Sequence, residues 1–322
     1  MKNLNLSIII PCYNEEAVIN KTYRRVKEVL NNNKLDTHEI IFINDGSKDK
    51  TRELLSAIAN QDKTVKIIHF SRNFGHQAGV SAGVNICTGD IAIIIDADMQ
   101  DPPELFPEML KIHREQGANV VYGVRRSRRG ESLFKIITAK IFYRIINLLS
   151  DTELPSDTGD FRLIDRKVID EFKKLDEKNK YIRGIIAWIG FKQVSFLYDR
   201  EPRMDGETKY PLRKMFSFAT NGLLYFTTKP LSIAIAFGFI NTIIGLLLAA
   251  YVLIAKLFDT THTVQGWAST LIIIIFFGGI QLLSVGLLGK YIGSIFEEVK
   301  KRPEYIIEST QNIGQGLSTE TE

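Results

Sequence analysis

The stretch Ile91-Ala92-Ile93-Ile94-Ile95-Asp96-Ala97-Asp98 joins an unbroken apolar run to two carboxylates that stand two residues apart. An apolar run of this kind, rich in β-branched residues, is typical of a strand buried on both faces, and such strands belong to parallel sheets covered by helices. Residues two apart on an extended chain point to the same side, so both carboxylates can face one cation. Hard oxygen ligands without a neighbouring His or Cys favour Mg²⁺ or Mn²⁺.

Similar apolar runs alternate with helical stretches on both sides of this strand. The expected strands are 6–10, 39–43, 65–70, 91–95 and 119–122, and the expected helices are 15–30, 50–60, 78–87 and 103–116. This alternation predicts an α/β fold, Rossmann-like, with a mostly parallel sheet and helices on both faces.

Polar clusters follow four of the expected strands, at residues 11–15, 44–47, 71–77 and 96–101. In open parallel sheets ligands bind beyond the carboxyl ends of the strands, so these clusters predict one site. The sequence contains neither G-x-G-x-x-G nor G-x-x-x-x-G-K-[ST], which argues against a dinucleotide site and against P-loop chemistry.

The average composition hides a second, apolar part of the chain. The 322 residues are 45% hydrophobic and 24% charged with a net charge of +4, yet the stretch from Pro230 to Gly289 holds only two charged residues, Lys256 and Asp259. A spanning helix needs about 20 apolar residues. We expect two transmembrane helices, at about 231–255 and 267–289. Two buried core helices are the alternative, but helices of soluble proteins rarely lack a polar stripe.

Basic residues flank the expected spans and predict their orientation, because cytoplasmic segments are enriched in Lys and Arg. The linking loop offers Lys256 alone, whereas the outer flanks carry Arg213, Lys214, Lys229, Lys290, Lys300, Lys301 and Arg302. The apolar run 6–10 is too short for a secretory signal. We therefore expect a multi-pass protein of the cytoplasmic (inner) membrane, with both termini and the globular domain in the cytoplasm.

The sequence predicts four regions. They are a catalytic domain at 1–209, a juxtamembrane amphipathic helix at 210–229, the hairpin at 230–290 and a cytoplasmic tail at 291–322. A further basic and apolar helix at 131–149 either lies in the headgroup plane or packs on the core, and its nearness to the hairpin favours the membrane surface. The net charge of +4 is too small to indicate nucleic acid.

Several motifs in this order resemble those of the inverting, nucleotide-sugar-dependent glycosyltransferases of family 2, which have the GT-A fold. They are Pro11-Cys12-Tyr13-Asn14-Glu15, Asn44-Asp45-Gly46-Ser47 and Asp96-Ala97-Asp98-Met99-Gln100-Asp101-Pro102-Pro103-Glu104. The stretches Ser71-Arg72-Asn73-Phe74-Gly75 and Thr158-Gly159-Asp160-Phe161-Arg162-Leu163, with the hairpin, narrow the resemblance. They look like the polyprenyl-phosphate glycosyltransferases, specifically the bactoprenol glucosyltransferase group, cousins of dolichyl-phosphate mannose synthase.

The resemblance implies roles for the residues on the donor side. Pro11, Tyr13, Asn14 and Glu15 are expected to line the nucleotide pocket, with Asp45 on the base or ribose. Asn14 alternatively caps the following helix. Asp96 is assigned to the ribose and metal side, Asp98 to the metal, and Gln100 to the metal or the sugar, with Mg²⁺ or Mn²⁺ as cofactor.

The resemblance also implies a phosphate-bearing acceptor, which needs cationic donors. Candidates are the run Arg125, Arg126, Arg128 and Arg129, of which Arg125 fits the family best, and more weakly Arg200 and Arg203 from a loop. Asp160 matches the family's catalytic base, with Asp157 second. Because a phosphomonoester has a second pKa of about 6 and is already mostly ionised at neutral pH, Asp160 alternatively places the acceptor or orients Arg162.

The expected activity is transfer of a sugar, with inversion, from a UDP-sugar to undecaprenyl phosphate. Glucose is favoured over N-acetylglucosamine, galactose and aminoarabinose. A processive polysaccharide synthase is disfavoured because Q-x-x-R-W is missing. A catalytically silent membrane adaptor of a flippase system is disfavoured by the intact candidates Asp96, Asp98, Gln100 and Asp160. The resemblance implies a homo-oligomer, with a tetramer favoured.

Overall fold

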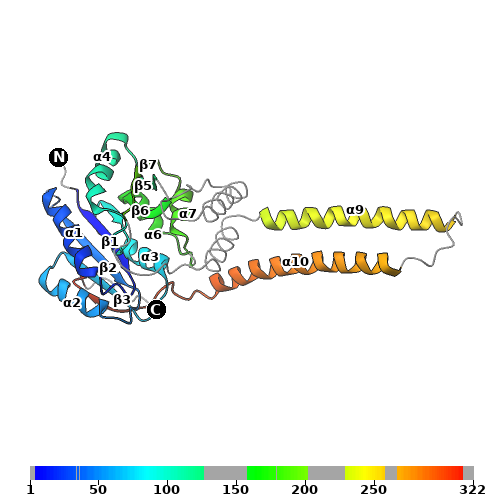
Figure 1. Cartoon of the computed structure of the whole chain (residues 1–322), viewed down its shortest axis with the longest axis horizontal. Helices are drawn as coiled ribbons and strands as arrows, with labels where there is room; N and C mark the ends of the chain where they lie inside the picture. Colours follow the sequence, from blue (N-terminus) through cyan, green and yellow to red (C-terminus); the bar gives the residue numbers. More distant parts are fainter. Residues whose placement is uncertain are drawn as a thin grey trace. The chain divides into compact units, whose positions relative to one another are not determined.

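The computed structural model describes residues 4–33, 35, 37–126, 158–178, 180–201, 229–257 and 267–314. Contacts divide the described chain into two units (Figure 1). A globular unit takes in the described residues up to 201 and again from Pro303, and a helical unit takes in those from 229 to 302.

The globular unit is built on a mixed sheet that has eight strands within the described residues. Their order is β7-β5-β6-β4-β1-β2-β3-β8. Strands β1 to β4 are parallel where they pair, β6 and β8 run antiparallel to their neighbours, and β7 is parallel to β5. The bounds are β1 Leu6–Cys12, β2 His38–Asn44, β3 Val65–Phe70, β4 Ile91–Ile94, β5 Val120–Arg125, β6 Thr158–Asp165, β7 Gln193–Tyr198 and β8 Ile307–Gln311.

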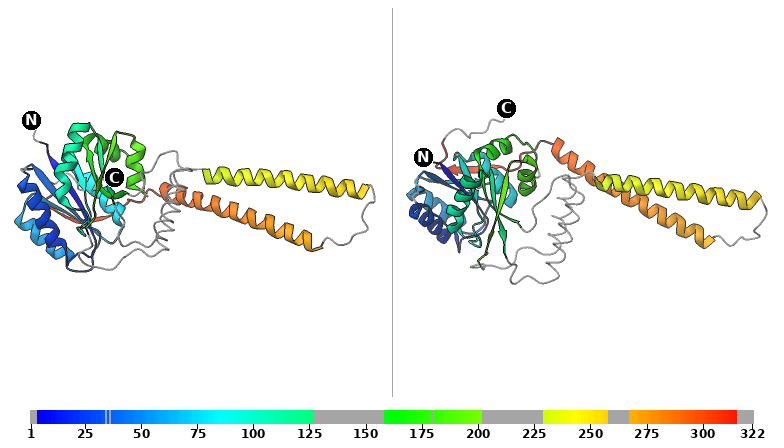
Figure 2. Two further views of the ribbon diagram at one scale, coloured as in Figure 1. Left: turned by 45° about the horizontal axis from the view of Figure 1, so that its top comes forward. Right: turned by 90° about the horizontal axis from the view of Figure 1, so that it is seen from above.

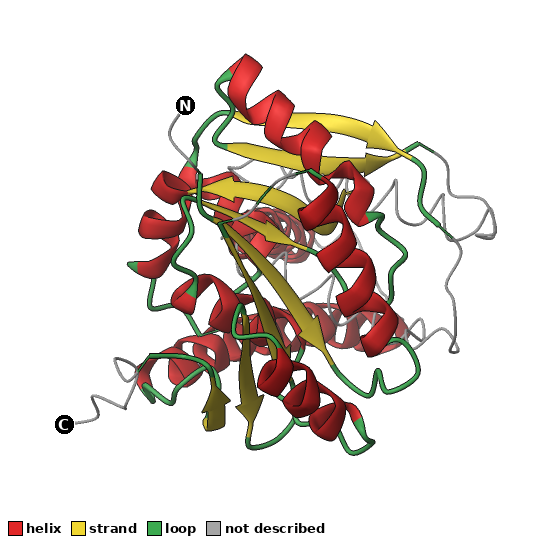
Figure 3. Ribbon diagram, turned by 90° about the vertical axis from the view of Figure 1, so that its left-hand side faces the viewer, coloured by secondary structure: helices red, strands yellow, loops and turns green. Residues whose placement is uncertain are grey.

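Helices cover the sheet on both faces, as Figure 3 shows. In β1, Ile8 and Ile10 belong to the apolar core that includes residues of α1, α2 and α4, whereas Ile9 lies against Gly83 of α3 on the opposite face. Helices α6 and α7 pack with α3. The bounds are α1 Ile19–Asn32, α2 Thr51–Gln61, α3 His76–Ile86, α4 Phe106–Gln116, α6 Arg166–Lys173 and α7 Ile182–Ile189, with a short 3₁₀ turn at Pro103–Leu105.

This architecture confirms the expected fold class and the elements predicted between residues 6 and 122. The fifth predicted strand, β5, does not lie beside β4, because β6 inserts between them and pairs antiparallel with both. The sequence of β6 has Asp160, Arg162 and Asp165 among its apolar residues. β6 therefore lacks the unbroken apolar run that marks the other strands. β6 brings Asp160 into the middle of the sheet.

The helical unit contains α9 Lys229–Leu257 and α10 Trp267–Val299, which contact each other (Figure 2). Many of their large apolar side chains are exposed, among them Leu282 and Leu283 at 74% and 75%. Phe276–Val299 is long and apolar enough to cross a membrane, and Leu231–Leu247 is apolar but shorter. The two expected spans thus coincide with helices, and α10 continues past the expected end to Val299.

Part of the expected C-terminal tail is folded. Residues from Pro303 belong to the globular unit, where β8 pairs antiparallel with β3 at the edge of the sheet. The helices expected at 131–149 and 210–229 lie outside the described residues, apart from Lys229, the first residue of α9.

Candidate active site

Loops that follow β1, β2, β3 and β4 meet at one edge of the sheet, where the sequence predicts the site. Each described loop contains one residue with left-handed backbone: Asn14 (φ 53°), Gly46 (φ 63°), Gly75 (φ 103°) and Met99 (φ 55°). Such conformations allow sharp turns and are uncommon for residues other than glycine. The backbone therefore turns tightly within each polar cluster, directly after the strand ends.

The β2 and β3 loops are packed directly on each other. A Cβ atom on Gly46 would lie 2.6 Å from Asn73 N and would overlap the Arg72 backbone. Asp45 ties the same loops together, since its carboxylate accepts hydrogen bonds from Phe74 N at 2.6 Å and Gly75 N at 2.9 Å. Burial raises the pKa of Asp45 from its usual value, against the effect of these backbone donors. Asp45, expected on the base or ribose, holds the β3 loop in this structure.

The β1 loop is held by the start of the β2 loop. The Asn14 backbone N–H donates to Ser47 Oγ at 3.0 Å, and the Asn14 side-chain oxygen accepts from Lys48 N at 2.8 Å. The Glu15 backbone N–H donates to Thr51 Oγ1 at 2.9 Å. The alternative role of Asn14 as a helix cap is wrong, because α1 begins only at Ile19 and Asn14 bonds across to Lys48.

A cavity of about 510 Å³ opens beside these loops, at the ends of β2 and β3. Of the expected nucleotide residues, Tyr13 lines it. Three cations contribute, Lys48, Arg52 and Arg72. The complete lining is Tyr13, Asn44, Gly46, Ser47, Lys48, Arg52, Phe70, Ser71, Arg72, Asn73 and Glu308. An aromatic ring, amides and cations together suit a planar, anionic ligand.

Asp96 and Asp98 follow β4 as expected. Asp96 Oδ1 is buried and accepts no hydrogen bond from the described residues. Burial raises the pKa of Asp96 to about 6, although nearby His76 acts in the opposite direction. Asp98 Oδ1 accepts from Gln100 N at 3.2 Å across the left-handed Met99. Asp96 Oδ1, which makes no hydrogen bond to a described residue but has His76 Nε2 3.5 Å away, fits a cation ligand. Within the described ranges, however, no three His, Cys, Asp or Glu side chains are grouped to hold a metal ion.

Asp101 anchors this loop to the end of β7. The buried Asp101 carboxylate accepts from the Tyr198 hydroxyl at 2.5 Å and lies 3.3 Å from Arg200 Nε. The backbone N–H of Glu201 donates to the Gln100 carbonyl at 2.9 Å. Arg200, expected in a loop near the donor, therefore forms an ion pair with Asp101. Arg203 lies outside the described residues.

Asp160 is the centre of a charged cluster at the start of β6. Arg183 of α7 lies 2.7 Å from Asp160 Oδ1 through Nε, and its Nη2 donates to Oδ2 at 3.1 Å. His76, the first residue of α3, lies 3.1 Å from Asp160 Oδ2 and 3.5 Å from Asp96 Oδ1 through the same Nε2. His76 thus connects the Asp96 and Asp160 carboxylates.

The electrostatics of this cluster favour the charged forms of Asp160 and His76. Burial acts to raise the pKa of Asp160, but Arg183 and His76 outweigh it and hold that pKa well below its usual range. Burial acts to lower the pKa of His76, but Asp96 and Asp160 outweigh it and raise that pKa to about 9. At neutral pH Asp160 is therefore an ionised carboxylate held between two cations, a poor proton acceptor.

Asp160 pairs with Arg183 and not with Arg162, the arginine expected beside it. Arg162 is buried, and its Nη2 donates to the Gly159 carbonyl at 3.1 Å. No local pattern marks Arg183 as a site residue, because it stands in the apolar helix Ile182–Ile189. His76 begins α3 and lies 3.1 Å from Asp160 Oδ2, a long-range contact that no local pattern in the sequence indicates.

Arg125, at the end of β5, lies beside the Asp160 strand. A Cβ atom on Gly159 would be 3.2 Å from Arg125 Nη2, so the glycine makes room for the guanidinium. Arg126 lies 3.5 Å from Asp199 and is largely exposed. Arg128, Arg129 and Asp157 lie outside the described residues. The structure thus places the Arg125 guanidinium against Gly159, the residue before Asp160 in β6.

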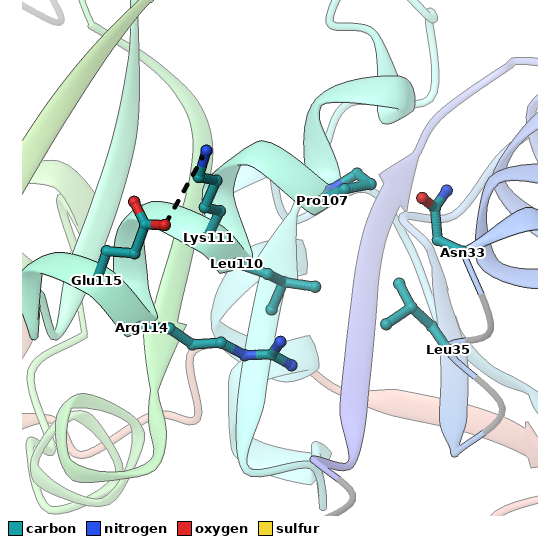
Figure 4. A pocket seen from close by; sticks show the side chains of 7 residues that line it. All are labelled: Asn33, Leu35, Pro107, Leu110, Lys111, Arg114 and Glu115. Atoms are coloured by element: carbon teal, nitrogen blue, oxygen red, sulfur yellow. Dashed lines mark ion pairs between the residues drawn. The ribbon is translucent and has the colours of Figure 1, made fainter. Parts of the chain in front are cut away.

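A second cavity, of about 360 Å³, lies between the end of α1 and α4 (Figure 4). Its lining is Asn33, Leu35, Pro107, Leu110, Lys111, Arg114 and Glu115. None of the expected site residues is among them. The chemistry predicted from the sequence therefore belongs to the other end of the sheet.

Comparison with known proteins shows the family of the chain. The model for "Glycosyl transferase family 2" matches residues 7–173. An uncharacterized glycosyltransferase, YkcC, of Bacillus subtilis is 47% identical over 97% of this chain and 96% of its own. A prophage bactoprenol glucosyl transferase homolog of Escherichia coli K12 is 36% identical over 94% and 98%, and the bactoprenol glucosyl transferase of Shigella phage SfII is 36% identical over 95% and 98%.

Among solved structures, mannosyl-3-phosphoglycerate synthase from Rubrobacter xylanophilus is similar with a TM-score of 0.46 and 17% identity, over 69% of this chain and 73% of that one. The curated relatives match over nearly their whole length, and the family model covers residues that carry β1 to β6. The chain belongs to glycosyl transferase family 2, and it is a glycosyltransferase.

Proposed function

We propose that this protein transfers a sugar from a UDP-sugar to a polyprenyl phosphate, with inversion at the sugar carbon and with glucose as the favoured sugar. The observation that carries the proposal is the cluster of Arg183, His76 and Asp160 next to Asp96 at the carboxyl ends of the strands. Two relatives that match over most of the chain are named for transfer of glucose to bactoprenol, and this supports a lipid phosphate acceptor.

The donor is proposed to bind along the strand ends. Its nucleoside part fits the cavity lined by Tyr13 and Arg72, while its diphosphate faces Asp96 and Asp98 across β1. Mg²⁺ or Mn²⁺ would be held by Asp96 and Asp98, with Gln100 and the diphosphate oxygens completing the ligand set. When bound, the cation neutralises charge on the diphosphate leaving group.

The acceptor phosphate is proposed to bind at Arg183, His76 and Arg125, with Arg128 and Arg129 as further cationic donors. Guanidinium groups match phosphate oxygens two at a time. A phosphate oxygen attacks the anomeric carbon, the bond to the diphosphate breaks, and UDP leaves with the bonding electrons. Since the acceptor oxygen is mostly ionised at neutral pH, no proton need be removed.

Asp160 is therefore proposed to position Arg183 and His76 instead of acting as a base. Both of its oxygens already accept bonds from cations, at 2.7 and 3.1 Å. Asp157 remains the second candidate for a base.

For the membrane part, we propose that α9 and α10 form a transmembrane hairpin of the cytoplasmic membrane, with the globular unit and both termini in the cytoplasm. Phe276–Val299 and the exposed apolar side chains of both helices support this. The hairpin would keep the water-soluble donor site beside the lipid acceptor. Assembly into a homo-oligomer, favoured as a tetramer, is part of the same proposal.

The test is to incubate the purified full-length protein in detergent with undecaprenyl phosphate, Mg²⁺ or Mn²⁺ and a panel of labelled sugar nucleotides. We expect label in the lipid fraction and one UDP released per sugar transferred, most strongly with UDP-glucose. Asp98→Asn should abolish transfer, while Glu115→Gln, which removes a carboxylate at the far cavity, should not. If labelled polymer forms without added lipid, the result favours a polysaccharide synthase. If no sugar nucleotide leads to release of UDP, the result favours a silent adaptor.

A further inference from the structure

The chain that follows the helical unit returns to the candidate donor cavity. Seven residues, Lys300 to Ile306, separate the end of α10 from β8. In the antiparallel pairing with β3, Phe70 is opposite Ile307 and Ile67 is opposite Gln311. The first residues of β8 therefore lie at the carboxyl end of β3, where the cavity opens.

Tyr305 and Ile306 hold two residues that line the cavity. The Tyr305 ring stacks on the Phe70 ring, with centroids 4.9 Å apart and an interplanar angle of 14°. The Ser71 backbone N–H donates to the Ile306 carbonyl at 3.0 Å. The Tyr305 hydroxyl accepts from Asn85 Nδ2 of α3 at 3.1 Å, which fixes the ring from its other end. Phe70 and Ser71 both line the cavity.

Glu308 lines the cavity directly. Its Oε2 lies 2.9 Å from Arg52 Nη1, and Arg52 Nη2 donates to Ser309 Oγ at 3.2 Å. One of the three cations of the cavity is therefore held by β8. Because Arg52 lies on α2 and Glu308 on β8, this side of the cavity is closed by elements far apart in the sequence.

We propose that the segment Tyr305–Glu308 forms the outer wall of the pocket for the donor's nucleoside, and that Tyr305 positions Phe70 and Ser71 for it. This rests on the proposed function, since the ligand is the nucleoside of the donor. A planar base needs a rigid, closely spaced wall, and a stacked aromatic pair with one backbone hydrogen bond supplies it. The donor site is then complete only when the chain beyond α10 has joined the sheet.

The test compares Tyr305→Leu, Tyr305→Phe and Gln311→Ala by calorimetric titration with UDP in the presence of Mg²⁺, and by steady-state kinetics. Gln311 lies at the other end of the same strand and bonds to Ser56, so Gln311→Ala weakens β8 away from the cavity. We expect Tyr305→Leu to weaken UDP binding about tenfold and to raise the donor KM without changing kcat. Tyr305→Phe, which keeps the ring stack, should recover most of that loss, and Gln311→Ala should bind as the unaltered protein does.

A second pair of variants does not depend on the packing of Tyr305. Glu308→Gln frees Arg52 from its ion pair and removes a negative charge from the cavity wall, so anionic UDP should bind about threefold more tightly, while Glu53→Gln, which removes a charge beside Arg52 outside the cavity, should leave UDP binding unchanged. Unchanged UDP binding in Tyr305→Leu or in Glu308→Gln would overturn the inference, as would equal losses in Tyr305→Leu and Gln311→Ala. If the unaltered protein transfers sugar and these variants bind UDP normally, this inference alone fails. If the unaltered protein binds no UDP, the proposed function fails with it.

Discussion

Arg183 and Asp160 form a two-point ion pair, with Nε 2.7 Å from Oδ1 and Nη2 3.1 Å from Oδ2. The pair joins α7 to β6 and leaves the Asp160 carboxylate with both oxygens occupied, because His76 shares Oδ2. A carboxylate bound in this way is suited to holding cations in place, not to accepting a proton. The predictions below start from this distinction.

Asp160→Asn and Arg183→Gln should each lower turnover about 100-fold, because misplacing a substrate-binding group by about 1 Å can cost this much. If the two residues act as one unit, the double variant should be no slower than the worse single variant. The measurement is kcat and the acceptor KM for all four proteins. Multiplicative losses would contradict a shared role, and near-normal turnover of Asp160→Asn would remove both the base and the positioning role.

Asp96→Asn and Asp98→Asn should weaken the dependence of UDP binding on Mn²⁺. Asp96 Oδ1 is buried without a hydrogen bond from the described residues, so an amide there loses the charge that a cation needs. We expect UDP affinity to become nearly independent of added Mn²⁺ in either variant. Glu115→Gln serves as control, and a metal response that persists in both Asp variants would rule out these ligands.

Gly46→Ala should destabilise the globular unit and abolish UDP binding. Gly46 has φ 63°, and its missing side chain leaves room for the Arg72 backbone. Gly117 gives a matched control, since it has φ 58° but nothing within 4 Å of an added Cβ. Gly117→Ala should therefore cost only the backbone strain of about 1 kcal/mol, whereas Gly46→Ala adds the steric clash. Equal losses of thermal stability in the two variants would show that the loops do not depend on this contact.

Glu304 should make the stability of the protein depend on pH. Burial raises the pKa of Glu304 to about 7, although Ser81 and Lys180 act in the opposite direction. A raised carboxyl pKa means that the folded state favours the protonated form. The stabilisation is therefore complete below pH 4.5 and is lost as the pH rises through 7, by roughly 3 kcal/mol for a shift of this size.

Thermal unfolding of the protein and of Glu304→Gln between pH 4.5 and 8 tests this prediction. Relative to Glu304→Gln, the unaltered protein should lose stability as the pH rises. Parallel curves would mean that Glu304 ionises in the folded protein as it does in water.

The sequence was sufficient for the strands β1 to β4 and for the loops that follow them, because their apolar runs and polar ends are local signals. It did not indicate β8, whose sequence Ile307–Gln311 is polar and whose partner, β3, lies more than 200 residues away. It also missed the pairing of Arg183 with Asp160, because an arginine in an apolar helix has no local sign of its partner. The place of β8 in the sheet and the Arg183–Asp160 pair both depend on contacts between residues far apart in the sequence, and local sequence preferences do not report such contacts.

The position of β8 after the helical unit has a consequence for biosynthesis. Between β7 and β8 the ribosome must make the whole helical unit, so β3 stays an unpaired sheet edge until β8 emerges. Open edges invite pairing with other chains. A nascent chain that stalls or is cut within the helical unit would therefore carry an aggregation-prone edge and would lack the segment Tyr305–Glu308, the wall of the proposed nucleoside pocket.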